Sequence, residues 1–350
     1  MNDFCIYYRS RFVIIVMRPE ARFTTKQQLA YLNAFAALVH VVSGALGYFI
    51  ARHAEPTLPL IAPLFEFVQS DNATSLITQI PKTISNVRVF QPIIAVEFIT
   101  AAFHLIYLAA LLVPSVDKFI KTWIIDSGSV NSLRWVEYAI TASTMSAFAG
   151  INIGIADFYY FVRQYSEGFA LQMCGFLLEL LDSSIDKDKR LANVVWNIGS
   201  LLNVAGVGIL LYQIFASKPH TNLFYYNVAP FAIWFNTFGI IAWLTFRKYK
   251  QFADPYFSER WYIILSLSTK VSVFWLGFST FKSITESKGF SNRTGVDWAV
   301  IRYTSAYGLL GFVACIAIYD YYQWQTHVRA CKCRSASKMQ PTEIRFVVRQ

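Results

Sequence analysis

A series of long apolar segments is the feature that most constrains how this chain can fold. A helix that crosses a lipid bilayer needs about 20 mostly apolar residues. Eight segments reach that length, although Arg302 and Asp320 limit the uncharged part of the last one to residues 303–319. The pattern predicts an all-α membrane protein, a bundle of seven transmembrane helices with an additional eighth near the C-terminus. The segments are 29–51, 92–113, 130–154, 158–181, 192–216, 223–246, 259–281 and 297–321.

The charge content supports the same conclusion. Only 15% of the residues are charged and 55% are hydrophobic, whereas a soluble domain carries roughly a quarter charged residues. The net charge of +10 would suggest nucleic-acid binding in a soluble protein. Here the basic residues cluster between the apolar segments. We therefore attribute them to membrane topology and expect membrane lipid, and no nucleic acid, as a partner.

The distribution of Lys and Arg predicts how the chain is oriented, because basic residues collect in cytoplasmic connections. With the N-terminus inside, the inner side holds 20 Lys and Arg residues and the outer side holds 7. Without the six in the C-terminal tail, the count is still 14 to 7. The N-terminus is therefore predicted to be cytoplasmic, and eight spans return the C-terminus to the cytoplasm as well.

These assignments divide the chain into one membrane domain and its flanking segments. Within the long outer loop, 75–80 and 85–90 are predicted to form short strands. The predicted parts, in order, are a cytoplasmic extension (1–28), a seven-helix domain (29–282) with its long outer loop (52–91), an outer loop with the eighth helix (283–322), and a basic cytoplasmic tail (323–350).

Lys270 lies in the middle of the seventh apolar segment, where a charge is costly and indicates function. It follows Glu259 by eleven residues, which places it about 16 Å into the bilayer. An amine at that depth does not reach either surface easily, so it is deprotonated, paired or covalently converted. An aldehyde cofactor would convert it to a Schiff base, and the protonated form of a Schiff base requires a buried counterion.

Glu137 in the third segment is the candidate for that counterion. It begins a helix face that it shares with Thr141 and Thr144. The alternative is that Glu137 lies at the membrane interface and pairs with Arg134. Ser266 lies one helical turn before Lys270 and on the same face.

Two further ionisable groups, His40 and His104, lie in the first and second segments. A single buried histidine is more often a hydrogen-bonded packing residue than a proton carrier, but two in adjacent helices favour a polar network. Glu97 and Glu179 are predicted to lie near opposite membrane faces and to be solvated. Trp234, Asn236 and Trp275 are candidates for lining a pocket. The sequence contains no motif that indicates a metal site or an enzyme active site.

At these residues the sequence resembles the heliorhodopsins, a family of retinal-binding rhodopsins with inverted membrane orientation. The likeness runs from about residue 29 to 282. It is carried by Leu133-Arg-Trp-Val-Glu137-Tyr138, by Phe235-Asn-Thr-Phe238, and by Glu259-Arg-Trp-Tyr-Ile-Ile-Leu-Ser266 followed by Lys270 and Trp275. His40 and His104 occupy positions where the family has histidines.

The resemblance implies a rhodopsin-like bundle in which Lys270 binds all-trans retinal and Glu137 is its counterion. It also implies that Ser266 and the two histidines belong to the Schiff-base network, and that the protein forms a homodimer. The remaining candidate contacts to retinal are Tyr138, Thr141, Trp234, Asn236 and Trp275. The chain departs from the family in its longer N-terminal extension and in the roughly 68 residues after the lysine helix.

The function implied is that of a light sensor with a slow photocycle and no pumping. Ordinary microbial proton pumps have carboxylates where this chain has Phe148 and Ser266, so a fast outward pump is not expected. One alternative is a light-gated proton conductance through His40, His104 and Glu137. Another is a light-regulated scaffold whose tail, 323–350, binds a cytoplasmic protein. An enzyme is not expected, because the tail carries no catalytic motif.

Overall fold

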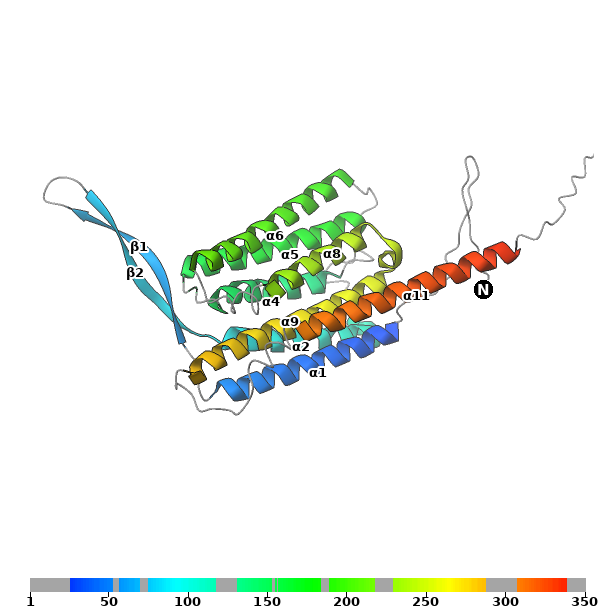
Figure 1. Cartoon of the computed structure of the whole chain (residues 1–350), viewed down its shortest axis with the longest axis horizontal. Coiled ribbons are helices and arrows are strands. Elements are labelled where there is room, and N and C mark those ends of the chain that lie inside the picture. Colours follow the sequence, from blue (N-terminus) through cyan, green and yellow to red (C-terminus); the bar gives the residue numbers. More distant parts are fainter. Residues whose placement is uncertain are drawn as a thin grey trace, which may run out of the picture.

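A bundle of long helices makes up most of the chain (Figure 1). The computed structural model describes residues 26–52, 57–69, 75–117, 131–152, 155, 157–183, 189–217, 229–287 and 307–338. The helices are α1 (Lys26–Ala51), α2 (Gln91–Leu112), α4 (Ser132–Asn152), α5 (Phe158–Ser183), α6 (Lys189–Ser217), α8 (Ala229–Phe246), α9 (Pro255–Ser287) and α11 (Leu309–Lys338), with a short 3-10 helix, η2 (Lys250–Ala253). Two strands, β1 (Thr57–Gln69) and β2 (Ser75–Arg88), form a hairpin.

The helices follow the apolar segments of the sequence, and neighbours along the chain pack together, as α1 does with α2 and α4 with α5. The eighth segment differs in its bounds. It was predicted as 297–321, but α11 begins at Leu309 and continues to Lys338, and 297–306 lie outside the described residues. The helix continues past the charged residue Asp320, whose carboxylate is paired with Arg260.

Four of the described helices are long and apolar enough to cross a membrane, by length and composition: Lys26–Ala51, Gln91–Leu112, Arg190–Tyr212 and Pro255–Ser279. A fifth, Ala232–Phe246, is apolar but shorter. The chain is therefore an integral membrane protein with several apolar helices. Polar residues dilute the hydropathy of α4 and α5, which together contribute Arg134, Glu137 and Glu179 to the buried interior.

α9 is the central helix of the bundle. In its most apolar stretch of 18 residues, 83% of the residues are buried inside the bundle, whereas the corresponding share for α6 is 11%. It packs against α1, α2, α4, α8 and α11. Gly47 of α1 permits one of these contacts, because a side chain there would collide with the ring of Phe274 on α9. Side chains on α9 are therefore placed where many helices can reach them.

The β1–β2 hairpin extends from one end of the bundle, which we call the hairpin end (Figure 1). Two short strands were predicted at 75–80 and 85–90. Instead β2 is a single strand that ends at Arg88, and β1 was not predicted. The prolines at 59, 63 and 81 are tolerated because each strand of a two-stranded sheet has a free edge. The fold is therefore mostly helical, as predicted, with its two strands confined to the loop between α1 and α2.

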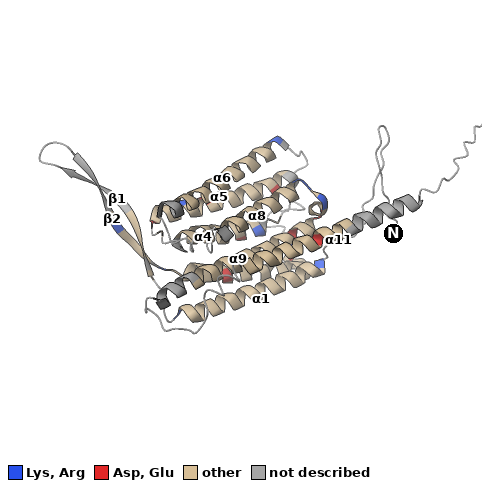
Figure 2. Cartoon of the chain, viewed as in Figure 1, with Lys and Arg blue, Asp and Glu red and all other residues tan. Residues whose placement is uncertain are grey.

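At the opposite end, which we call the η2 end, α1 and α9 begin and α8 ends (Figure 1). Figure 2 shows Lys and Arg gathered there, at the start of α1, the start of α6 and the segment after α8. Lys248 and Lys250 in that segment adopt positive φ angles of 49° and 53°, which lie in the left-handed region. The tight turn brings α9 back alongside α8.

Candidate functional site

Lys270 of α9 and Glu137 of α4 form a buried ion pair in the interior of the bundle. Their side chains are 4% and 2% exposed, respectively. The Lys270 Nζ atom also lies 5.2 Å from the centre of the Tyr138 ring. Thr141 Oγ1 donates a hydrogen bond of 2.9 Å to the backbone oxygen of Glu137. A charged lysine and a carboxylate thus compensate each other where neither has access to water.

The alternative partner of Glu137 is engaged elsewhere. The Arg134 guanidinium donates hydrogen bonds to Glu179 of α5 and to Glu259 of α9. Its Cζ atom lies 3.9 Å from the centre of the Tyr262 ring. Asn131 Nδ2 donates to Glu259 Oε1 over 2.9 Å. We call Asn131, Arg134, Glu179 and Glu259 the Arg134 cluster. It joins α4, α5 and α9, one helical turn from Glu137.

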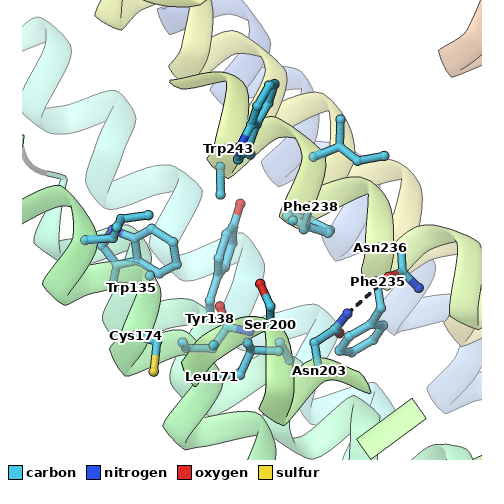
Figure 3. Close-up of a pocket in the computed structure, with 18 of the residues that line it drawn as sticks. Trp135, Tyr138, Leu171, Cys174, Ser200, Asn203, Phe235, Asn236, Phe238 and Trp243 are labelled. Atoms are coloured by element: carbon cyan, nitrogen blue, oxygen red, sulfur yellow. Dashed lines mark hydrogen bonds between the residues drawn. The ribbon is translucent and has the colours of Figure 1, made fainter. Parts of the chain in front are cut away.

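A cavity of about 580 Å³ opens beside the ion pair, and Lys270 is part of its wall. Its lining comes from α4, α5, α6, α8 and α9 and is mostly apolar and aromatic. Figure 3 shows Trp135 and Tyr138 from α4, with Phe235, Phe238 and Trp243 from α8, around the hollow. Such a volume is typical of cavities that hold a small organic ligand.

Two features shape the walls of this cavity. Asn203 Nδ2 donates a hydrogen bond of 3.1 Å to Asn236 Oδ1, drawn as a dashed line in Figure 3, which joins α6 to α8. Gly175 of α5 lies directly against the Trp135 ring, and a Cβ atom there would overlap it. The ring can therefore approach α5 this closely only because that position has no side chain.

The candidate residues are distributed around the cavity in different ways. Tyr138, Asn236 and Lys270 line it. Ser266 and Thr141 are buried in the surrounding core, and Trp234 is fully buried among the aromatic residues behind the wall. Trp275 lies away from the cavity lining, where its Nε1 donates to Ser43 Oγ over 3.4 Å. Trp135 and Phe238 were quoted from the sequence only as parts of motifs and not as lining residues, and Trp243 and Asn203 were not named at all. The rotation of each helix decides which of many aromatic and polar residues face inward.

The predicted histidines are part of a row of polar contacts between α1 and α2. His40 Nδ1 lies 2.6 Å from Glu97 Oε2, and His104 Nδ1 donates to Asn33 Oδ1 over 2.8 Å. The two imidazole rings stack with their centres 5.6 Å apart. We call Asn33, His40, Glu97 and His104 the α1–α2 polar ladder. All four are buried.

The ladder corrects the prediction that Glu97 is solvated. Its side chain is 1% exposed and is bonded to His40, and Glu179 is bonded to Arg134 with 17% exposure. The signal for the ladder was present in the sequence. Asn33 and His40 are seven residues apart, as are Glu97 and His104. That interval of two helical turns places each pair on one face of its helix.

The ladder is close to the ion pair and contains unused polar atoms. His40, Glu97 and His104 lie near enough to Lys270 to interact with it electrostatically. Among the described residues, Nε2 of both histidines and Oε1 of Glu97 have no hydrogen-bond partner. Since buried polar atoms are normally satisfied, this region is suited to hold water or to pass a proton. No group of three or more metal-ligating side chains occurs within the described ranges.

Together, these features suit an apolar cofactor attached at one end. Lys270 provides an amine at the cavity wall, Glu137 provides a compensating charge, and the aromatic side chains provide an apolar lining. Retinal, an aldehyde with an apolar polyene, has this chemistry, and the residues present fit it.

The comparison of the chain with known protein families points to the same cofactor. The family model described as heliorhodopsin matches residues 29–281. No curated protein matches the chain.

Proposed function

Because the chain belongs to the heliorhodopsin family, whose members are retinal-binding rhodopsins that sense light, we propose that it is a photoreceptor with all-trans retinal on Lys270. The family consists of photoreceptors rather than enzymes. The single observation that carries the proposal is the buried Lys270–Glu137 pair at the wall of an aromatic cavity. When bound as a Schiff base, retinal supplies the absorption of visible light and a change of shape on isomerisation.

The residues around Lys270 have distinct roles in this proposal. Glu137 keeps the nitrogen of Lys270 protonated in the dark, because an opposite charge within hydrogen-bonding distance favours the charged form. Tyr138 presents its ring face to the same nitrogen, and a cation is attracted to such a face. Ser266, His40 and His104 complete the proton network. The aromatic walls, with Asn236 in the lining and the buried Thr141 and Trp234 near it, hold the polyene and exclude water. Trp275 is half-buried outside the lining, so its contact with retinal is proposed through the family resemblance alone.

The bundle is proposed to cross the membrane with its η2 end in the cytoplasm. The basic ends of α1 and α6 and the basic segment after α8 lie there (Figure 2), as expected of a cytoplasmic face. Seven helices form the photoreceptor domain, and α11 is the eighth. A homodimer remains part of the proposal through the family resemblance alone. A cytoplasmic partner for 323–350 remains part of it as the scaffold alternative, which rests on the basic tail.

A light-gated proton conductance is the second candidate, and the α1–α2 polar ladder favours it. The ladder places two histidines and a carboxylate in a row beside Lys270, with unpartnered nitrogen and oxygen atoms among them. Photocurrent in a voltage-clamped cell separates the two candidates. A sensor gives a photocycle without sustained current, whereas a conductance gives a current that follows the proton gradient.

The test of the proposed function is the absorption spectrum of protein purified with all-trans retinal. A visible band that bleaches with hydroxylamine is expected, because hydroxylamine attacks a Schiff base. Lys270→Ala should lack the band, whereas Lys250→Ala, which removes a lysine from the η2 end, should keep it. A bleachable band that survives in Lys270→Ala would contradict the assignment.

A further inference from the structure

Helix α11 lies beyond residues 29–281, the part of the chain that the family model matches, yet it is packed on the photoreceptor domain. Val313 is buried, and Leu309, Leu310 and Ile316 pack against the same aromatic cluster that includes Trp261 and Tyr262 of α9. That cluster also contains Trp135 and Tyr138, which line the cavity. The first half of α11 is thus continuous with the core around the candidate retinal site.

A polar clamp then fixes α11 at the η2 end. Both terminal nitrogens of Arg260 donate to Asp320 Oδ1, over 3.1 and 3.2 Å. Gln251 Nε2 donates to the backbone oxygen of Asp320 over 3.0 Å. Lys250 Nζ lies 4.3 Å from the ring centre of Trp324 and 5.3 Å from that of Tyr321. Past Trp324 the helix runs on beyond the η2 end to Lys338 (Figure 1).

The clamp is joined to the Lys270–Glu137 pair by a short series of contacts. Arg260 follows Glu259 directly, and Glu259 binds Arg134. Arg134 precedes Glu137 by one helical turn on α4, and Glu137 binds Lys270. In addition, Lys270 and Arg260 lie on the same helix, ten residues apart, or about 15 Å. A shift of α9 at Lys270 therefore reaches Asp320 both through the helix and through the Arg134 cluster.

We propose that α11 is the read-out element of this photoreceptor, and that the Arg260–Asp320 clamp couples its position to the state of the retinal site. The proposal rests on the proposed function, and it names the element through which the signal leaves the membrane. Transfer of the proton from the nitrogen of Lys270 to the carboxylate of Glu137 would neutralise both groups and change the field at Arg134, which is shared between Glu179 and Glu259. The geometry of a largely buried ion pair tolerates little change, so the clamp loosens and α11 moves.

Coupling of this kind is reciprocal, because two linked equilibria affect each other equally. If the illuminated state of the retinal site favours a loosened clamp, then loosening the clamp must change the free energy of that state relative to the dark state. Asp320→Asn removes the charge but keeps the shape of the side chain, and Asp320 is not among the residues that line the cavity. It is expected to alter the thermal recovery of the dark state several-fold and to leave the dark absorption maximum nearly unchanged.

The experiment measures α11 directly as well as the photocycle. Cys331 and a second cysteine introduced as Lys26→Cys at the start of α1 carry spin labels, with the other four cysteines replaced by Ser. The distance between the labels is expected to change on illumination. In Asp320→Asn the distribution of distances between the two labels should already be broad in the dark. This measurement does not depend on light. Exchange of the two charges, Arg260→Asp with Asp320→Arg, should restore a narrow dark distance and the parental recovery rate.

Each outcome has a defined meaning. If the visible band is present but the distance is the same in light and dark, α11 is not the read-out element and the proposed function stands. If Asp320→Asn recovers its dark state at the parental rate and shows the parental distance between the labels, the proposed coupling is wrong. An absent visible band overturns both proposals. The control is Lys26→Gln, which removes an exposed charge from the same end and should change neither recovery nor the spectrum.

Discussion

Two buried carboxylates lie near Lys270 and have different partners. Glu137 is paired with Lys270 itself, whereas Glu97 is bonded to His40 of the α1–α2 polar ladder. A lysine and a glutamate inside apolar segments are unusual, so the sequence marked both as candidates. It left open whether Glu137 pairs with Lys270 or with Arg134, and the contact with Lys270 comes from the structure. Glu97 was assigned to the wrong environment although the predicted segment, 92–113, matches α2 to within one residue. The sequence does not show which face of a helix meets its neighbour, and Glu97 lies on the face that packs against His40 of α1.

The different partners lead to different expected spectra. Glu137→Gln removes the charge that stabilises the protonated nitrogen of Lys270, so the visible band should shift to the red, and the pH at which the band is lost should fall. Glu97→Gln is the matched control, since it removes an equally buried carboxylate from the neighbouring pair. Its band should stay close to the parental position. A spectrum and titration unchanged in Glu137→Gln, with a large shift in Glu97→Gln, would exchange the two roles.

At the scale of the element, the positions of helices were predicted far better than their ends or faces. Apolar segments located the helices because burial in lipid requires a minimum length. The hairpin was only half predicted, since the prolines of β1 are unfavourable for a strand unless one edge is free. Which residues face the cavity depends on the rotation of each helix. An aromatic content of 17% supplies too many equivalent candidates to choose among.

Close contact between α4 and α5 at Gly175 gives a prediction at this scale. Gly175→Ala places a Cβ atom in the Trp135 ring, so the ring or the helix must shift. Overpacking of this kind costs on the order of 1–3 kcal/mol, and the wall of the cavity changes shape. A lower melting temperature and a displaced absorption maximum are expected.

Gly208 of α6 supplies the control for that prediction. Nothing lies within 4 Å of a Cβ atom built there, so Gly208→Ala should be neutral or slightly stabilising, because Ala favours the helix by about 1 kcal/mol. Equal effects of the two substitutions on melting and absorption would show that the contact with Trp135 is not what matters at Gly175.

At the scale of the whole molecule, the orientation of the bundle determines where α11 emerges. The basic η2 end is expected in the cytoplasm, and α11 runs past that end. In intact cells, Cys331 and Cys333 should therefore resist an impermeant thiol reagent when the other cysteines are replaced. They should react after permeabilisation. Labelling before permeabilisation would place the tail and the η2 end outside.

The α1–α2 polar ladder has a consequence for how the protein is made. Its two hydrogen-bonded levels lie seven residues apart on each helix, or about 10.5 Å. A step of one residue along the helical screw would move a helix by about 1.5 Å and turn it by about 100°. That step would separate the polar groups from their partners, and an unsatisfied polar group in hydrocarbon costs several kcal/mol. We therefore expect α1 and α2 to pair in a single register as they insert, with the ladder acting as a ruler for their assembly.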